Sequence, residues 1–258
     1  MYSYALSRTL HYIVNLHLWH PKKKNIFICK VDLDSGYHRC HLSVSTAKES
    51  ITSHNDLIYI ALRMTFGGAP CPSMWGYISD TLADISNSLI GNAHWDHEKL
   101  FDPLSNTLQD PLSLPASIPF HQAKPLSVDI PENDHGKVDI YIDDSIGIAP
   151  DIRDSVIQVS KSIPLTIHSI ARPLNLSDSL PRKDIISLKK FSAEGRMEET
   201  KIILGWLVNT RTLTISLPED KHTRWSTDIK KLLAAPKARF KDIESLIRRL
   251  NHVSVSTQ

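Results

Sequence analysis

Two adjacent carboxylates in the sequence have the residue type and the setting for metal-ion chemistry. Asp143 and Asp144 fall between two runs, 138–142 and 146–148, in which valine or isoleucine alternates with other residues. Such alternation predicts a β-hairpin, and Asp tolerates the backbone angles of a tight turn. Mg²⁺ prefers oxygen ligands and usually takes only one or two carboxylates from a protein. The hairpin tip is therefore a candidate magnesium site, although an ordinary polar turn explains the same pattern.

Asp32 supplies a further carboxylate at the end of a strand. Residues 25–31 form a short apolar run that ends at Asp32, and taken alone this residue would be an ordinary strand-end turn residue. Beside a hairpin tipped with Asp143 and Asp144, it completes the arrangement for two-metal phosphoryl transfer. In that chemistry shared carboxylates hold two cations roughly 3.5–4 Å apart, on the attacking and leaving oxygens. We therefore expect these three carboxylates to converge and to bind two Mg²⁺ ions, which Mn²⁺ could replace.

Five sequence blocks, in this order, resemble the palm domain of reverse transcriptases, in particular those of retrotransposons. The first three blocks are specific in combination, whereas the last two are weak when taken singly. The blocks are KVDLDSGYH at 30–38, FGGAPCPS at 66–73, YIDD at 141–144, KKFSAEG at 189–195 and ILGWL at 203–207. The resemblance runs from about residue 30 to residue 217.

The resemblance implies a role for each matching residue. Asp32, Asp143 and Asp144 become the catalytic, metal-binding carboxylates, and Tyr37 takes the position of the aromatic residue that excludes a ribose 2′-hydroxyl. The other implied nucleotide-binding residues are Phe66, Gly67, Tyr141 and Lys189. The implied primer-grip residues are Leu204, Gly205 and Trp206. Lys189 or its neighbour Lys190 could protonate the leaving pyrophosphate. The implied partners are an RNA or DNA template with its primer and deoxynucleoside triphosphates, and the implied reaction is RNA-directed DNA synthesis.

The fold class that follows is α+β, a polymerase palm with a small antiparallel sheet, helices on one face, partial fingers and a truncated thumb. We expect a remnant of a fingers helix at 1–25, the palm at 26–218 and the helical start of a thumb at 219–258. Residues 91–136 are proline-rich with little periodicity, which indicates an irregular insertion. Only about thirty residues precede Asp32. By the resemblance we therefore expect an incomplete copy that extends primers poorly or not at all.

The spacing of apolar residues predicts the elements around the site. Helices are expected at 6–17, 73–90, 152–163, 225–232 and 240–250. Ser73 should cap the second of these, and Pro164 should kink or end the third. Residues 201–207 and 212–217 should pair as two strands. The last helix carries Arg248 and Arg249 among its basic residues, which could track a phosphate backbone or form an ordinary solvated face.

Composition restricts the setting of the protein but not its chemistry. The net charge of +2 over 258 residues is too small to indicate nucleic-acid binding. Three cysteines without metal spacing suit a reducing compartment, and no apolar run is long enough for a membrane span. We expect an intracellular protein of the cytoplasm or nucleus, and make no prediction of its oligomeric state. Two alternatives stay open: an inactive retroelement relic with residual nucleic-acid binding, and another palm-type nucleotidyl transferase or cyclase.

Overall fold

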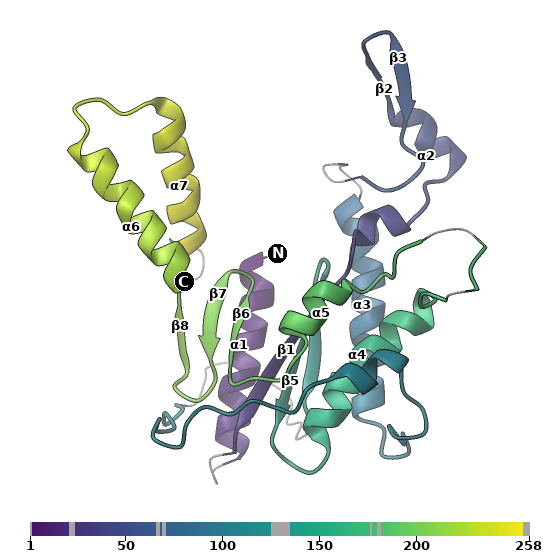
Figure 1. The fold of residues 1–258 in the computed structure, drawn as a ribbon, viewed down its shortest axis with the longest axis vertical. Helices are drawn as coiled ribbons and strands as arrows, with labels where there is room; N and C mark the ends of the chain where they lie inside the picture. Colours follow the sequence, from purple (N-terminus) through teal and green to yellow (C-terminus); the bar gives the residue numbers. More distant parts are fainter. Residues whose placement is uncertain are drawn as a thin grey trace. The chain divides into compact units, whose positions relative to one another are not determined.

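The computed structural model describes residues 2–20, 24–65, 68, 71–124, 135–175, 177–179 and 182–254 (Figure 1). The chain forms two compact units, each built from segments that are distant in the sequence. The larger unit comprises 27–112 and 133–198, and the smaller unit comprises 1–26, 113–132 and 199–258. The domain boundaries expected from the resemblance stay a prediction, because these units group residues by contact and not by role.

The larger unit contains a three-stranded sheet, a separate hairpin and the helices around them. Its elements are β1 (Ile26–Asp32), η1 (Gly36–Arg39), α2 (Val44–Glu49), β2 (Ile51–His54), β3 (Leu57–Ile60), α3 (Cys71–Ile90), η2 (Pro103–Thr107), β4 (Lys137–Tyr141), β5 (Asp144–Pro150), α4 (Ser155–Ile170) and α5 (Leu188–Glu194). The three-stranded sheet has the order β1-β5-β4, and β4 pairs antiparallel with β5.

The core of the larger unit lies between this sheet and the helices α3 and α4. These helices pack against each other, α3 also packs on β4, and α4 packs on β5 (Figure 1). Trp75 and Leu82 of α3 and Val159 and Ile163 of α4 are almost completely buried there. The expected α+β class, with small antiparallel sheets and packed helices, is therefore confirmed.

Two predicted helix boundaries were wrong. Pro164 does not end its helix, because α4 continues through it to Ile170. Pro164 lacks an N–H and costs about 3 kcal/mol in a helix interior, but Ile163 and Ile167 beside it are fully buried, and each buried side chain contributes about 1.5–3 kcal/mol. Helix α3 begins at Cys71 rather than after Ser73, because Pro72 suits the first turn of a helix.

Between residues 91 and 136, the described residues form little regular structure. They contain the short helix η2 and a bridge from Leu112 to Glu198, with irregular chain between. Asp102 accepts a hydrogen bond from the backbone N–H of Leu104 at 2.9 Å and so caps η2. Segment 113–132 belongs to the smaller unit, whereas the part before it belongs to the larger unit.

The smaller unit joins a helix, a second three-stranded sheet and a helical hairpin (Figure 1). Its elements are α1 (Tyr2–Trp19), β6 (Thr200–Ile203), β7 (Trp206–Asn209), β8 (Thr214–Ser216), α6 (Glu219–Ala234) and α7 (Phe240–Ser254). The prediction of a single strand at 201–207 was wrong. Leu204 and Gly205, with φ of 48° and 86°, form the turn between β6 and β7, which pair as a hairpin. Two consecutive residues with positive φ are typical of the turns that connect hairpin strands.

A buried ion pair fastens part of the insertion to the smaller unit. Arg211 contacts Glu199 at 2.6 Å, and both side chains are almost inaccessible to solvent. The same guanidinium donates to the carbonyl of Pro115 at 2.8 Å and lies 4.8 Å from the ring centre of Phe120. Arg211 therefore holds the part of the insertion that contains Pro115 and Phe120.

None of the helices in the described ranges is long and apolar enough to cross a membrane. The cysteines Cys29, Cys40 and Cys71 are all free thiols, and Cys29 and Cys71 are buried.

Candidate active site

The adjacent strands β1 and β5 bring the three predicted carboxylates together. Asp32 ends β1, and the next residue, Leu33, donates its N–H to the carbonyl of Asp143 at 2.9 Å. Tyr141 pairs with Asp144 across the hairpin, so Ile142 and Asp143 form its two-residue turn and Asp144 begins β5. The hairpin tip therefore lies beside the end of β1, as its alternating pattern and the neighbouring Asp32 predict.

The turn that presents Asp143 is strained and is held by a tryptophan. Ile142 has a φ of 56°, in the left-handed region that a β-branched residue rarely adopts. Its carbonyl accepts a hydrogen bond of 2.7 Å from Trp75 Nε1. Backbone strain of this kind persists only where the surroundings enforce it, and it is concentrated at functional sites.

Gly36 allows the close approach of Asp143 and Trp75. A Cβ added to Gly36 would lie 2.6 Å from Asp143 Oδ1 and 2.6 Å from Trp75 Cζ2. The same Oδ1 is buried and has no hydrogen-bond partner among the described residues. A buried carboxylate oxygen normally has a partner, so this atom is available to a ligand that the protein alone does not provide.

Burial and the neighbouring carboxylates raise the pKa values of Asp143 and Asp144. Burial, together with the charges of Asp32 and Asp144, raises the pKa of Asp143 to about 6, against the opposing effect of Lys190. Burial also raises the pKa of Asp144, as does a hydrogen bond with Asp32, while Lys30 opposes the shift. Like charges that share a site disfavour ionisation, and a cation bound among them would remove this penalty.

Two lysines lie against the carboxylates. Lys190 Nζ is 2.8 Å from Asp32 Oδ1, and Lys30 Nζ is 3.5 Å from Asp144 Oδ1 and 2.7 Å from Glu194 Oε2. Burial opposes the charge of Lys30, but the hydrogen bond to Glu194 and the carboxylates nearby outweigh it and raise the pKa of Lys30.

Of the two neighbouring lysines, Lys190 contacts Asp32. Lys189 has an exposed side chain, and its nucleotide-binding role stays a prediction. The sequence analysis missed Lys30 and Glu194, although both lie inside the first and fourth resembling blocks. Their position in those blocks was the signal that could have identified them.

The other predicted nucleotide-binding residues are only partly placed. Tyr37 lies in η1, is buried and stacks on Trp75 with ring centres 5.5 Å apart. Burial and the charge of Asp143 raise the pKa of Tyr37, and burial and Asp144 raise the pKa of Tyr141. Phe66 and Gly67 lie outside the described residues.

The predicted primer-grip residues form the β6–β7 turn of the smaller unit. Leu204 and Trp206 are buried, and the carbonyl of Gly205 accepts a hydrogen bond from Lys221 Nζ at 3.2 Å.

Helix α7, for which a phosphate-tracking face and an ordinary solvated face were both open, has Arg248 paired with Glu244 and Arg249 paired with Asp228. Arg239, just before the helix, pairs with Asp242. Acidic residues therefore balance much of the basic charge of this helix.

The carboxylates have the donor chemistry for a hard divalent cation. No group of three His, Cys, Asp or Glu side chains in the described ranges is placed so as to hold a metal ion by itself. Asp143 Oδ1 nevertheless has no hydrogen-bond partner among the described residues, and a bound cation would offset the burial and repulsion that raise the pKa values of Asp143 and Asp144. Mg²⁺ sites commonly combine one or two carboxylates with substrate phosphates, so these residues fit such an ion.

Comparison with solved structures identifies a likeness at the level of the fold. A foamy-virus protease–reverse transcriptase, solved in complex with an RNA/DNA hybrid, superposes with a TM-score of 0.51 and 13% sequence identity over 88% of this chain. The match covers 21% of that chain, so this protein corresponds to about a fifth of its neighbour's length. No protein-family model and no curated protein matches the sequence. The likeness shows a reverse-transcriptase-like fold.

Proposed function

We propose that the larger unit is the palm of an RNA-directed DNA polymerase and that Asp32, Asp143 and Asp144 hold two divalent cations for nucleotidyl transfer. The observation that carries the proposal is the meeting of these carboxylates at adjacent strand ends, where Asp143 Oδ1 is buried without a partner. The reverse-transcriptase-like fold and the five resembling blocks support it. The neighbour's RNA/DNA hybrid supports a nucleic-acid partner in general.

Each side chain at the site has a proposed task. Bound Mg²⁺ or Mn²⁺ supplies charge neutralisation at the attacking and leaving oxygens. Asp32 and Asp143 hold both cations, and Asp144 supports them. Lys190, whose side chain is 52% exposed, is long and accessible enough to leave Asp32 and to donate a proton to the leaving pyrophosphate.

Tyr37 is proposed to exclude ribonucleotides. Its ring is fixed by stacking on Trp75, and its hydroxyl senses the charge of Asp143, so a rigid aromatic side chain borders the carboxylates. Tyr37→Val should relax the rejection of ribonucleotides, and Tyr37→Phe, which keeps the ring, should not. An equal preference for deoxynucleotides in the Val variant would reduce Tyr37 to a packing residue.

Primer extension tests the proposed reaction. The chain is incubated with primed RNA or DNA templates, deoxynucleoside triphosphates and Mg²⁺ or Mn²⁺, beside the variants Asp143→Asn and Asp80→Asn. Asp80 is an exposed carboxylate of α3 and provides a matched control. Extension that Asp143→Asn abolishes and Asp80→Asn preserves would support the proposal.

The remaining outcomes separate the alternatives. A folded chain that binds an RNA/DNA hybrid in the presence of Mn²⁺, but never extends the primer, would favour the inactive relic. Conversion of a nucleoside triphosphate to a cyclic nucleotide without any primer would favour a cyclase. Either result would overturn the proposed polymerase.

A further inference from the structure

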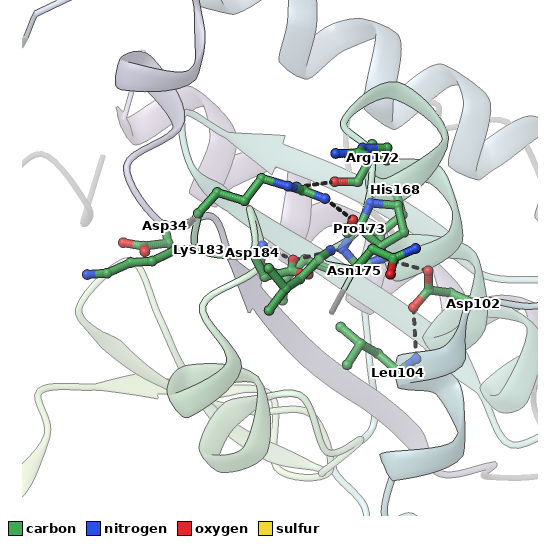
Figure 2. Close-up of polar contacts among 12 residues, drawn as sticks. Asp34, Asp102, Leu104, His168, Arg172, Pro173, Asn175, Lys183 and Asp184 are labelled. Atoms are coloured by element: carbon green, nitrogen blue, oxygen red, sulfur yellow. Dashed lines mark hydrogen bonds and ion pairs between the residues drawn. The ribbon is translucent and has the colours of Figure 1, made fainter. Parts of the chain in front are cut away.

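A second cluster of titratable groups is buried in the larger unit, apart from the three carboxylates (Figure 2). His168 of α4 lies between two aspartates, with Nδ1 2.6 Å from Asp102 Oδ2 and Nε2 2.8 Å from Asp184 Oδ1. All three residues are buried. An ionised carboxylate only accepts hydrogen bonds, so with both carboxylates ionised the ring donates from both nitrogens and is an imidazolium.

Each aspartate of the cluster is also anchored to the backbone of its own segment. Asp102 accepts from the N–H of Leu104 in the insertion. Asp184 accepts from the N–H of Ile186 through Oδ1 and from that of Leu174 through Oδ2, both at 2.9 Å. The imidazolium consequently joins three separate parts of the chain, namely the insertion, helix α4 and the segment that precedes α5.

A short series of backbone hydrogen bonds leads from Asp184 to the candidate active site. Asp34 N–H donates to the carbonyl of Ile185 at 2.7 Å, and Ser187 N–H donates to the carbonyl of Asp32 at 2.9 Å. Three residues after Ser187, the side chain of Lys190 contacts the carboxylate of Asp32. Main-chain hydrogen bonds therefore join the segment that follows Asp184 to the chain at Asp32 and Asp34.

An arginine also holds this segment. Arg39 donates to the carbonyls of Lys183 at 2.9 Å and of Asp184 at 2.6 Å, and its Nε donates to the carbonyl of Asp34. Arg39 is the last residue of η1, which also contains Tyr37. The segment 183–187 is therefore held between the end of β1 and the imidazolium.

We propose that His168 is a positioning residue, whose bonds to Asp102 and Asp184 hold the segment 184–190 against Asp32 and so set the geometry of the carboxylate site. The effect on catalysis rests on the proposed polymerase function, whereas the effect on the position of the segment 184–190 does not. The insertion takes part through Asp102. Without Asp102, one nitrogen of the His168 ring would have no acceptor, and only the bond to Asp184 would remain.

The charges around the cluster agree with this role. Burial disfavours the imidazolium, but the hydrogen bonds and charges of Asp102 and Asp184 outweigh it and raise the pKa of His168. Burial favours a neutral Asp184, but the N–H of Leu174, His168 and the N–H of Ile186 outweigh it and lower the pKa of Asp184. The nearby Arg172 is paired with Asp178, so it does not compete for Asp184.

A cavity of about 320 Å³ borders the cluster and is lined in part by Leu104, Arg172 and Asn175. We assign it no ligand, because the carboxylates at its wall, Asp102 and Asp184, are already bonded to His168 and to backbone N–H groups.

Amide hydrogen exchange of the full chain tests the positioning role. The variant is His168→Gln, and the control is Asp96→Asn, which changes an exposed carboxylate of the same insertion that pairs with Lys99 at 2.7 Å. We expect the amides of Ile186 and Ser187 to exchange at least about tenfold faster in His168→Gln. Val138 lies in β4, the strand farthest from β1, and its N–H donates to Asn87 Oδ1 at 2.8 Å. In His168→Gln the amide of Val138 should keep its wild-type exchange rate. In Asp96→Asn all three amides should keep theirs.

A merely structural role predicts a different pattern. If His168 only adds to the stability of the unit, the amide of Val138 should accelerate together with those of Ile186 and Ser187, and this result would overturn the proposal. Unchanged exchange at Ile186 and Ser187 would overturn it as well. If His168→Gln fails to fold, Asp102→Leu, which has no hydrogen-bond acceptor and a similar side-chain size, removes the link to the insertion and is judged by the same amides.

Mn²⁺ affinity separates this inference from the proposed function. If the wild-type chain binds Mn²⁺ through Asp32, His168→Gln should weaken that binding by about tenfold, whereas Asp96→Asn should not change it. If the wild-type chain binds no Mn²⁺ but the local exchange pattern appears, the proposed function fails and the positioning of Asp32 stands. Normal Mn²⁺ affinity and normal exchange in His168→Gln would refute the inference and leave the proposed function intact.

Discussion

Gly36→Ala should displace the carboxylate site without altering any charged residue. The added Cβ would stand 2.6 Å from both Asp143 Oδ1 and Trp75 Cζ2, whereas real Cβ atoms essentially never come closer than 3.0 Å to another heavy atom. The Asp143 side chain can rotate away, but Trp75 is held by its bond to the Ile142 carbonyl and by its stack on Tyr37. Overpacking of this kind costs about 1–3 kcal/mol, and we expect about 2 kcal/mol at this position.

Gly76→Ala is the matched control for this substitution. Gly76 lies within α3 and would have nothing within 4 Å of its new Cβ. Because Ala is a better helix former than Gly, the control should gain about 0.5–1 kcal/mol of stability. Both variants receive the same additional methyl group, so they differ only in what surrounds it.

Urea unfolding and Mn²⁺ titration measure the two effects. Gly36→Ala should unfold at a lower urea concentration than the wild type and should bind Mn²⁺ at least about tenfold more weakly, since 1.4 kcal/mol corresponds to a factor of ten. Gly76→Ala should unfold later and bind Mn²⁺ normally. A Gly36→Ala variant that matched the wild type in both measurements would refute the close packing of Gly36 against Asp143.

Three further substitutions test the charges. The pKa of Asp143 is raised, so the folded state disfavours its charged form. Asp143→Asn should therefore stabilise the metal-free protein at pH 7 by about 1 kcal/mol, a figure discounted for the partial exposure of the side chain. Urea unfolding at a series of pH values should show this gain shrinking toward about pH 4.5. The His168 cluster should stabilise fully below about pH 6.5 and lose its contribution as the pH rises through the raised pKa of His168, or falls through the lowered pKa of Asp184. The urea midpoints of wild type and His168→Gln should accordingly differ most between about pH 4 and 6.5. Glu199→Gln should leave Arg211 buried without its counter-ion and cost about 3 kcal/mol in thermal unfolding.

Local sequence patterns were sufficient for the elements around the site. The alternation at 138–142 identified the β4–β5 hairpin, on which the helices α3 and α4 pack. The placement of Asp32 beside that hairpin followed from the apolar run that ends there. Both features depend on residues that are close in the sequence, or on the order of the resembling blocks.

Features that depend on distant residues could not be predicted in this way. His168 is one more polar residue in a helix until Asp102, 66 positions earlier in an aperiodic insertion, is folded against it. The contact of Lys30 with Glu194 likewise appears only after β1 and α5 meet. At Pro164 the local rule failed because burial of the flanking residues outweighs the lost hydrogen bond. At Leu204, an apolar residue adopts the positive φ that sequence rules reserve for Gly or Asn.

Electron paramagnetic resonance of Mn²⁺ tests the central claim most directly. The spectrum is recorded for the full chain with a deoxynucleoside triphosphate, beside the variant Asp32→Asn. Two ions held by shared carboxylates should lie roughly 3.5–4 Å apart, so the account predicts a spin-coupled pair of Mn²⁺ that Asp32→Asn removes. A spectrum of uncoupled Mn²⁺ that is identical in the wild type and in Asp32→Asn would contradict it.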